Sequence, residues 1–435
     1  MDYRANIKFR KNLNDLKRRP EDAAKDLGVS KEKVNDILEG KENINFDLVE
    51  KAVKVWPVNF SDFFYIVDDT KEGYKIFKNS QSNTTQRTMY RGGKPYYQYK
   101  DTVMSKISPF RPEWIKQLVV VNNSNPNNKK VKFNNGHFLH QFTYFIGPVN
   151  FYYMESNKKK VAEMNTGDSM YISPYVPHTF TTRRNSSNTL GFILALTYTD
   201  KVDSESLNEL TAVGYNLAKK YQLNLNNELN AFKSNLEYQM KIASITNDNL
   251  KEDLGIGFND LCKRNKIPDI EIIKKVSNLL NINVRDLLPP TQDYQVKIMN
   301  YKENKSWYYP SKKNKKYNFV ELTNLPQLPT SKAFELEILT EKENKVFLDV
   351  PSHQYIYNIG DSSCIIKFGN KKYENFEPGD SIYLKPNLKH KFIKKGKILV
   401  LRIGGRISGD ILYQLSMINK KNFKRVVQDN KSWFD

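Results

Sequence analysis

The pattern of hydrophobic and polar positions predicts two kinds of structure along the chain. Between residues 21 and 40, apolar side chains recur at helical spacing around a Gly-Val-Ser turn, whose Ser30 is suited to cap a second helix. A second helical block is expected from about residue 225 to 288. Runs dense in β-branched and aromatic residues, separated by Gly, Asn, Asp and Pro, predict antiparallel strands of a sandwich or barrel, as at 149–154, 189–199 and 397–405.

Two motifs occur twice along the chain, in the same order and about 212 residues apart. The stretch GDSMYISPYVPHTF at 167–180 returns as GDSIYLKPNLKHKF at 379–392. Upstream of each, HQFTYFIG from His140 returns as HQYIYNIG from His353. Two motifs that recur in order at one spacing indicate a tandem duplication.

Each copy is expected to hold a helical module followed by a β-barrel, so the predicted fold class is α+β. The first helical module resembles the helix-turn-helix of phage repressors, and the GDS-x-Y-x-x-P motif resembles one found in cupins, the small jelly-roll barrels. The expected domains are a helix-turn-helix-like module, a cupin barrel with a metal site, a second helical module, and a second cupin barrel, at 1–70, 71–202, 203–292 and 293–435.

Length and composition narrow the class of protein. The 435 residues exceed the roughly 250–300 at which a single core stops growing, so at least two cored units are expected. Two cysteines far apart, Cys262 and Cys364, exclude a disulfide scaffold. No apolar run approaches the ~20 residues that span a bilayer, and the first residues lack a secretory pattern. We therefore expect a soluble, cytoplasmic protein with no membrane partner.

The net charge of +21 raises the alternative of a transcription regulator, in which a helix-turn-helix accompanies a ligand-sensing cupin. The basic residues, however, lie in short runs scattered among Asn and acidic residues, a pattern typical of a solvated surface rather than of a nucleic-acid footprint. The segment KEKVNDILEG at 31–40 also carries more acids than bases. No nucleic-acid partner is expected, although the regulator stays as an alternative.

The histidines are confined to the barrel segments: the chain has five, at His137, His140, His178, His353 and His390. On a strand, residues i and i+4 face the same side, so His137 and Gln141 share a face while His140 points the other way. A later strand brings His178 back across the barrel. Two imidazoles and one oxygen ligand on one face are typical of non-haem iron(II) sites. The alternative is that the histidines only satisfy hydrogen bonds in the core.

The second copy retains only part of this set. Gln354 and His390 match Gln141 and His178, but the position that matches His137 is Val350. A valine cannot bind a metal, so the second barrel is expected to lack one. The sequence gives no support for other common types of enzyme site, because it lacks the HExxH, CxxC, P-loop, Rossmann and GxSxG motifs.

Three segments resemble the 2-hydroxyethylphosphonate dioxygenase / methylphosphonate synthase family: RGGKPYYQY at 91–99, NNGH at 134–137 and GDSMYISPYVPH at 167–178. Together with the duplicated layout, the resemblance covers essentially the whole chain. It implies an Fe(II)-dependent oxidoreductase that uses O2 to cleave the carbon–carbon bond of 2-hydroxyethylphosphonate, without 2-oxoglutarate. The implied metal ligands are His137, Gln141 and His178.

The resemblance also separates two branches. In the dioxygenase branch the third metal ligand is a glutamate six residues before the last histidine, where this chain has Ile172. In the synthase branch the third ligand is instead a glutamine four residues after the first histidine, and this chain has Gln141 there. The implied reaction is therefore conversion of 2-hydroxyethylphosphonate and O2 to methylphosphonate and CO2 or bicarbonate. The alternative is the dioxygenase reaction, which gives hydroxymethylphosphonate and formate.

The family's phosphonate contacts match Arg91, Tyr99 and Asn134. Arginine presents a fork that suits phosphonate oxygens. A lysine of the first helical module closes over the site in relatives, and Lys17 is its nearest match and a candidate catalytic residue. Homo-oligomerisation and the role of His140 stay open.

Overall fold

The computed structural model describes residues 3–108, 110–198, 202–261, 266–290, 295–369, 372–407, 409–428 and 431–433, so Cys262 lies outside the described residues. The chain forms two compact units. The smaller, helical unit consists of Met1–Lys71, Ser105–Pro109 and Ile407–Asp435, and the larger, sheet-containing unit of Glu72–Met104 and Phe110–Arg406.

The helical unit contains the predicted helix pair near its N-terminus. Ser30 caps the second helix of the pair by accepting a hydrogen bond from the Lys33 backbone N–H at 3.2 Å, and Gly28 ends the first in the left-handed conformation. These helices bury Leu27, Val34 and Ile37 in one core. The elements are α1 (Tyr3–Asp15), α2 (Pro20–Leu27), α3 (Lys31–Glu39), α4 (Phe46–Val55), η1 (Phe60–Phe63), α12 (Asp410–Met417) and α13 (Lys420–Gln428).

The sheet-containing unit carries a second group of helices, where the sequence predicts a helical block at about 225–288. Its core includes Phe232, Leu236, Ile273 and Val276. This prediction of helix is confirmed. The helical elements of the unit are α5 (Asn79–Thr84), α6 (Ser204–Val213), α7 (Tyr215–Ala218), η2 (Lys219–Tyr221), α8 (Glu228–Ala243), α9 (Asn247–Leu254), α10 (Phe258–Leu261), α11 (Ile270–Leu280), η3 (Val284–Asp286) and η4 (Tyr301–Glu303).

A first sandwich is built from two sheets. Its large sheet has the order β12-β9-β6-β11-β4-β3-β2, with β2 (Arg87–Arg91), β3 (Lys94–Asp101), β4 (Arg111–Gln117), β6 (His140–Ile146), β9 (Ser169–Ile172), β11 (Phe192–Tyr198) and β12 (Val296–Met299). Its small sheet has the order β5-β10-β7-β8, with β5 (Val120–Val121), β7 (Val149–Glu155), β8 (Lys158–Met164) and β10 (His178–Arg183).

A second sandwich repeats this order. Its large sheet runs β1-β19-β16-β21-β15-β14-β13, with β1 (Tyr74–Phe77), β13 (Ser306–Pro310), β14 (Lys315–Glu321), β15 (Lys332–Ile338), β16 (His353–Asn358), β19 (Ser381–Leu384) and β21 (Gly396–Ile403). Its small sheet runs β18-β17-β20, with β17 (Cys364–Phe368), β18 (Lys372–Phe376) and β20 (His390–Ile393).

The two sandwiches exchange their outermost strands. Strand β1 comes from the N-terminal half but pairs with β19 of the second sandwich, Ile76 opposite Ile382. Strand β12 comes from the C-terminal half but pairs with β9 of the first sandwich, Ile298 opposite Met170. Each sandwich is therefore completed by a strand from the other half of the chain.

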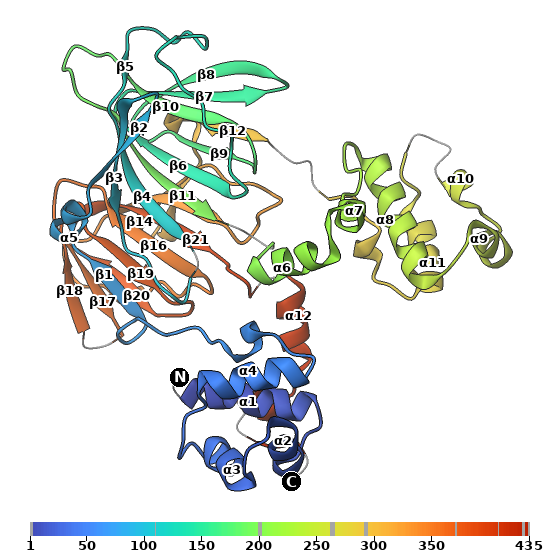
Figure 1. Ribbon diagram of the computed structural model, residues 1–435. Helices are drawn as coiled ribbons and strands as arrows, with labels where there is room; N and C mark the ends of the chain where they lie inside the picture. Colours follow the sequence, from blue (N-terminus) through green and yellow to red (C-terminus); the bar gives the residue numbers. More distant parts are fainter. Residues whose placement is uncertain are drawn as a thin grey trace. The chain divides into compact units, whose positions relative to one another are not determined.

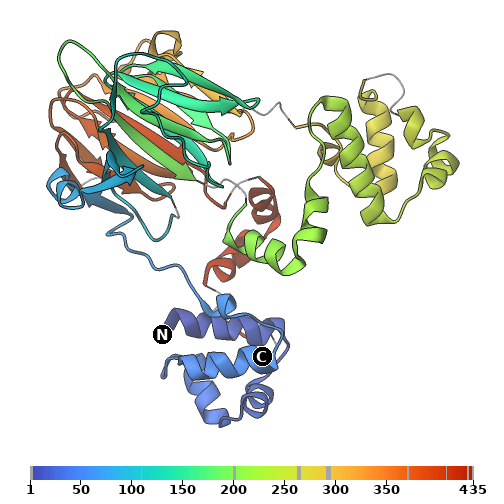
Figure 2. The same ribbon diagram turned by 45° about the horizontal axis from the view of Figure 1, so that its top comes forward.

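Apolar side chains fill three layers of the sheet-containing unit. One core lies inside each sandwich, and a third joins the outer faces of the two large sheets, with Tyr144 and Leu196 from the first packed with Tyr357 and Leu401 from the second. Figure 1 and Figure 2 show the two sandwiches side by side. In the part of the chain that the structure describes, no helix is long and apolar enough to cross a membrane.

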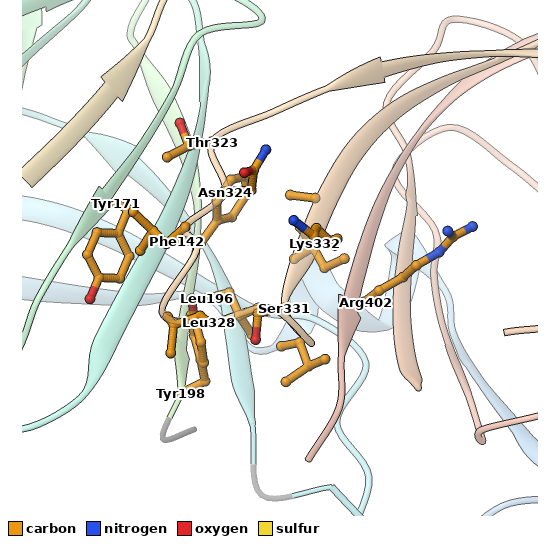
Figure 3. Close-up of a pocket in the computed structure, with 14 residues that line it drawn as sticks. Phe142, Tyr171, Leu196, Tyr198, Thr323, Asn324, Leu328, Ser331, Lys332 and Arg402 are labelled. Atoms are coloured by element: carbon orange, nitrogen blue, oxygen red, sulfur yellow. The ribbon is translucent and has the colours of Figure 1, made fainter. Parts of the chain in front are cut away.

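A small cavity of ≈20 Å³ lies between the two large sheets (Figure 3). Tyr171 and Lys332 line it from opposite sandwiches, whereas the side chain of Arg402 points away from the other labelled residues. Such a space holds about one water molecule. This cavity is therefore too small for a substrate.

Candidate functional site

The first sandwich contains a larger cavity of ≈190 Å³ on the inner face of its large sheet. It brings together six of the seven site residues predicted from the sequence, Arg91, Tyr99, Asn134, His137, Gln141 and His178. The seventh, Lys17, belongs to the helical unit. The same cavity is lined by Tyr97, Arg111, Glu113 and Thr197, which sequence reasoning did not single out.

His137 lies in the loop before β6 rather than on the strand, so strand parity is not the reason that it faces Gln141. The loop is held because the Tyr175 backbone N–H donates to the His137 carbonyl at 2.7 Å. Gly136 permits this approach: it has φ +74°, and a Cβ there would lie 2.6 Å from the Tyr175 backbone. The glycine of the NNGH motif is thus required by close backbone packing.

Backbone carbonyls fix the tautomer of both histidines. The Nδ1–H of His137 donates to the Leu139 carbonyl at 2.8 Å, and the Nδ1–H of His178 donates to the Val176 carbonyl at 2.8 Å. In a neutral imidazole the other nitrogen then carries a lone pair. Each Nε2 is therefore prepared to bind a metal, with the second nitrogen anchored as is usual for histidine ligands.

Gln141 presents an oxygen to the same place. Its Nε2 donates to the Thr143 hydroxyl at 2.8 Å, so Oε1 faces the site, 3.1 Å from the Nε2 of His137. The Gln141 side chain is buried, only 4% exposed. A carbonyl oxygen and an unprotonated imidazole nitrogen are both acceptors, and their close approach is favourable only with a cation or a proton between them.

The third donor lies beside the first. The rings of His137 and His178 have centroids 5.2 Å apart at 84°. Burial, with smaller contributions from His137 and Arg91, lowers the pKa of His178 to about 4. The imidazole is neutral near pH 7, as metal binding requires. Two imidazole nitrogens and one amide oxygen thus fit a divalent transition metal such as iron.

The candidate metal site differs in composition from the commonest metal-binding clusters. No group of three or more His, Cys, Asp or Glu side chains in the described part of the chain could hold a metal ion. The candidate trio contains two histidines and one glutamine, so it falls outside that pattern. Because a carboxamide is neutral, a metal bound to this trio would form a centre one charge unit more positive than one with a carboxylate ligand.

Asn134 links the metal-binding candidates to the rest of the cavity. Its Oδ1 accepts from the His178 backbone N–H at 2.8 Å, and its Nδ2 lies 3.2 Å from His178 Nε2. The carboxamide N–H₂ is therefore next to the place where a metal-bound ligand would lie. It can donate a hydrogen bond to an anionic oxygen there.

Arg91 supplies a positive charge on the same side. Its Nη1 donates to the Lys132 carbonyl at 2.8 Å and to the Thr179 hydroxyl at 3.1 Å, and its guanidinium lies 4.9 Å from the Tyr97 ring centre. The Tyr97 and Thr179 hydroxyls are hydrogen-bonded at 2.7 Å. These contacts hold the guanidinium in one orientation, as bidentate binding of a phosphonate or carboxylate needs.

The chain is 45% identical to methylphosphonate synthase of Nitrosopumilus maritimus (strain SCM1). The alignment spans 431 residues and covers 97% of this chain and 94% of that protein. The chain belongs to the methylphosphonate synthase family. The solved structure of Streptomyces albus HEPD with substrate 2-hydroxyethylphosphonate and Fe(II) bound matches with a TM-score of 0.93, 31% identity and 99% coverage of both chains. The structure of another 2-hydroxyethylphosphonate dioxygenase (HEPD) has a TM-score of 0.75 at 16% identity over 97% of this chain and 98% of that chain, and shows the fold alone. No family model matches.

Some of the cavity residues lie outside the motifs that the sequence analysis used. Glu113 lies inside the cavity, where burial raises the pKa of its carboxyl group and the Arg87 guanidinium opposes that shift. Arg87 pairs with both Glu113 and Asp101, and lies 5.4 Å from the Tyr99 ring centre. These residues come from β2, β3 and β4, outside the repeated motifs. Alternation along the strands was the only signal that could have identified them.

Lys17 lies between α1 and α2, with φ 53°. Its Nζ donates to the Asp15 carbonyl at 2.7 Å and lies 5.9 Å from the ring centre of Trp433. These contacts are all within the helical unit. They keep the ammonium group exposed at the end of α1.

The second sandwich has equivalent positions, but different residues occupy two of them. The Asn387 backbone N–H donates to the Val350 carbonyl at 2.8 Å, as that of Tyr175 does to His137, so Val350 stands at the position of the first ligand. The Nδ1 of His390 bonds to a backbone carbonyl, and its Nε2 has no hydrogen-bond partner within the described residues. Burial lowers the pKa of His390 to about 4.

Arg402 occupies this second site. It lies opposite Gln354 in the strand register, as Thr197 lies opposite Gln141. Its guanidinium is 5.0 Å from the Phe334 ring centre, and burial lowers its pKa to about 10. The second sandwich thus differs from the first by a valine at the first ligand position and by a buried cation opposite Gln354.

Proposed function

We propose that this chain catalyses the conversion of 2-hydroxyethylphosphonate and O2 to methylphosphonate and CO2 or bicarbonate. The observation that carries the proposal is the trio His137, Gln141 and His178, in which a neutral amide oxygen replaces the expected carboxylate. The family relationship at 45% identity supports the same reaction. The Fe(II) and 2-hydroxyethylphosphonate bound in the related HEPD support iron as the cofactor and that compound as the substrate.

Iron(II), when bound, supplies positions for substrate and O2 and the electron transfer that cleavage of the carbon–carbon bond requires. The chain's own residues orient the reactants. Asn134 donates to an oxygen next to the metal, and Arg91 and Tyr99 bind the phosphonate dianion across the cavity. The cavity walls, including Ile115 and Ala195, keep bulk water from the reacting carbon atoms.

Lys17 is proposed as the lysine that adds a positive charge to the bound phosphonate. Support comes from the family resemblance and from its exposed ammonium group, which backbone and ring contacts hold at the end of α1. A catalytic role in addition to binding is part of the proposal. His140 is assigned no role in the reaction, because the same histidine–tyrosine hydrogen bond recurs in the second sandwich, where His353 bonds Tyr383.

The finer architecture belongs to this proposal. We infer that the two sandwiches are cupin-type barrels and that the chain is a tandem duplication with domains at 1–70, 71–202, 203–292 and 293–435. The shared strand order and the repeated GDS motif support this origin. Helices α12 and α13 then lie in the last of these domains, after its strands.

Phosphorus NMR of a reaction with 2-hydroxyethylphosphonate, Fe(II) and air tests the proposed function. The synthase reaction gives methylphosphonate, and the alternative dioxygenase reaction gives hydroxymethylphosphonate. Unreacted substrate with specific, salt-dependent retention on duplex DNA is the result expected of a transcription regulator. Only the first result agrees with the proposal.

A further inference from the structure

A second, larger cavity lies on the other face of the same sheet. It has ≈260 Å³, and its walls include Lys100, Trp114, Lys116 and Phe192. Side chains alternate between the two faces of a sheet, so Lys100 and Trp114 point away from the face that carries Tyr99 and the iron site candidates. The opposite wall is formed by residues 358–360 of the second sandwich. The cavity is therefore separate from the site described above.

The walls of this cavity carry uncompensated positive charge. Two lysines line it and no carboxylate does. The Lys100 ammonium donates to the Asn83 amide oxygen at 2.6 Å, and the Lys116 ammonium lies 5.5 Å from the Phe192 ring centre. Within the described residues neither ammonium has an ion-pair partner. The strand register sets Gln98 opposite Lys116 and Trp114 opposite Lys100, so the two lysines are diagonal neighbours on one face.

The equivalent place in the second sandwich shows what this arrangement lacks. The common strand register makes Glu335 the counterpart of Trp114 and Lys397 the counterpart of Phe192. There the Glu335 carboxylate, 1% exposed, accepts hydrogen bonds from the Tyr144 and Tyr301 hydroxyls at 2.7 and 2.8 Å. It also pairs with the Lys397 ammonium at 2.6 Å. An internal carboxylate thus fills the place between the sandwiches that is a cavity on the other side.

We propose that the cavity is a binding site for a small organic anion that has a flat apolar part. Its anionic group lies between the Lys100 and Lys116 ammonium groups. Its flat part packs against the aromatic rings of Trp114 and Phe192. About 150 Å³ is enough for benzene, so a benzoate-sized anion fits. This inference does not depend on the proposed reaction.

Isothermal titration of the full chain with benzoate tests the proposal, with acetate and inorganic phosphate as comparison ligands. Saturable benzoate binding is expected, at least ten-fold tighter than binding of acetate or phosphate. In the Lys100→Gln/Lys116→Gln variant the affinity falls at least ten-fold. The matched control Lys129→Gln/Lys342→Gln removes two exposed lysines elsewhere and keeps the affinity.

Two further variants make the result decisive. Trp114→Phe retains both charges and an aromatic ring, and weakens benzoate binding less than the lysine variant does. Arg91→Gln removes the main cation of the candidate active site and leaves benzoate binding unchanged. Loss of binding in Arg91→Gln alone would place the anion in the active site and overturn the proposal. Absence of saturable binding, or equal affinity for phosphate and benzoate, would overturn it too.

Discussion

Gln141 and Ile172 lie directly opposite each other on the neighbouring antiparallel strands β6 and β9. Side chains of such a pair point to the same face with Cβ atoms about 4.5–5.5 Å apart. The position of Ile172 is where the dioxygenase branch is expected to carry its glutamate ligand. An oxygen ligand on either strand would therefore face the same place, which agrees with the exchange between the two branches that the family resemblance implies.

Replacement of Gln141 by glutamate is expected to keep iron bound but to change the reaction. The carboxylate lowers the charge of the metal centre by one unit and loses the Nε2–H donated to Thr143. We expect methylphosphonate formation to fall at least ten-fold, with hydroxymethylphosphonate as the competing product, measured by phosphorus NMR. The exposed Gln222→Glu serves as the control. Unchanged rate and product in Gln141→Glu would contradict the role given to the amide.

Arg91→Gln is expected to weaken substrate binding more than turnover. A hydrogen bond to a charged group is worth about 1.5–3 kcal/mol, so KM for 2-hydroxyethylphosphonate should rise roughly 10- to 100-fold. Steady-state oxygen consumption measures this change. Arg184→Gln removes an exposed arginine of the same sandwich and should leave KM unaltered. A normal KM in Arg91→Gln would exclude Arg91 as the phosphonate ligand.

Lys17→Met tests the residue assigned from the helical unit. If its ammonium group approaches the bound phosphonate, kcat/KM should fall about ten-fold or more, and the loss should shrink at high salt, which screens charge. Lys11→Met removes an exposed lysine from the neighbouring helix α1 and provides the control. Equal activity of the two variants would remove Lys17 from the site.

The second sandwich is expected to bind no iron, so the native chain should contain one iron per chain. Val350→His together with Arg402→Thr restores the missing ligand and removes the cation beside Gln354 and His390. This double variant should bind a second metal ion, counted by elemental analysis after anaerobic loading with Fe(II). Val346→His with Arg402→Thr is the matched control, which should bind one. Two ions in the native chain would contradict this account of the second sandwich.

Stability at low pH should depend on Glu343. Hydrogen bonds from Lys367, Lys391 and Tyr373 lower the pKa of its carboxyl group to about 2, from an ordinary 4.5. A group whose pKa is lowered in the folded state stabilises that state above its unfolded pKa, and the contribution is lost as pH falls from about 4.5 towards 2. The side chains of Lys367 and Lys391 are 8% and 4% exposed, so Glu343 compensates two buried charges.

Glu343→Gln should therefore lower the urea midpoint at pH 6 and make it less sensitive to pH between 4.5 and 2.5. Glu341→Gln, which removes an exposed carboxylate paired with Lys395, should have a smaller effect at pH 6. If Glu343→Gln kept the native midpoint and the native pH dependence, the buried lysines would have to be compensated in another way.

Much of the candidate site could be predicted because the chain repeats itself. The repeated motifs located His178 and Gln141, which line one cavity. The comparison of the two copies also predicted a difference between the sandwiches, because Val350 stands where the first copy has His137. Predicted strands such as 149–154 are present as part of β7 because β-branched and aromatic residues pack on a half-buried sheet.

Other features had no local signal. The exchange of β1 and β12 depends on pairing between segments of opposite halves of the chain, and nothing in the four residues of either strand specifies the partner. Glu113 and Arg87 meet Tyr99 only because three strands lie side by side. The assignment of 407–435 to the helical unit is likewise a tertiary fact, seen in the hydrogen bond from Asn14 to the Lys431 carbonyl.

Anomalous diffraction at the iron edge, from crystals grown anaerobically with Fe(II), tests the central claim most directly. A single peak per chain within bonding distance of His137 Nε2, His178 Nε2 and Gln141 Oε1 is the predicted result. A map without density there, or with its peak beside His390 in the second sandwich, would contradict it.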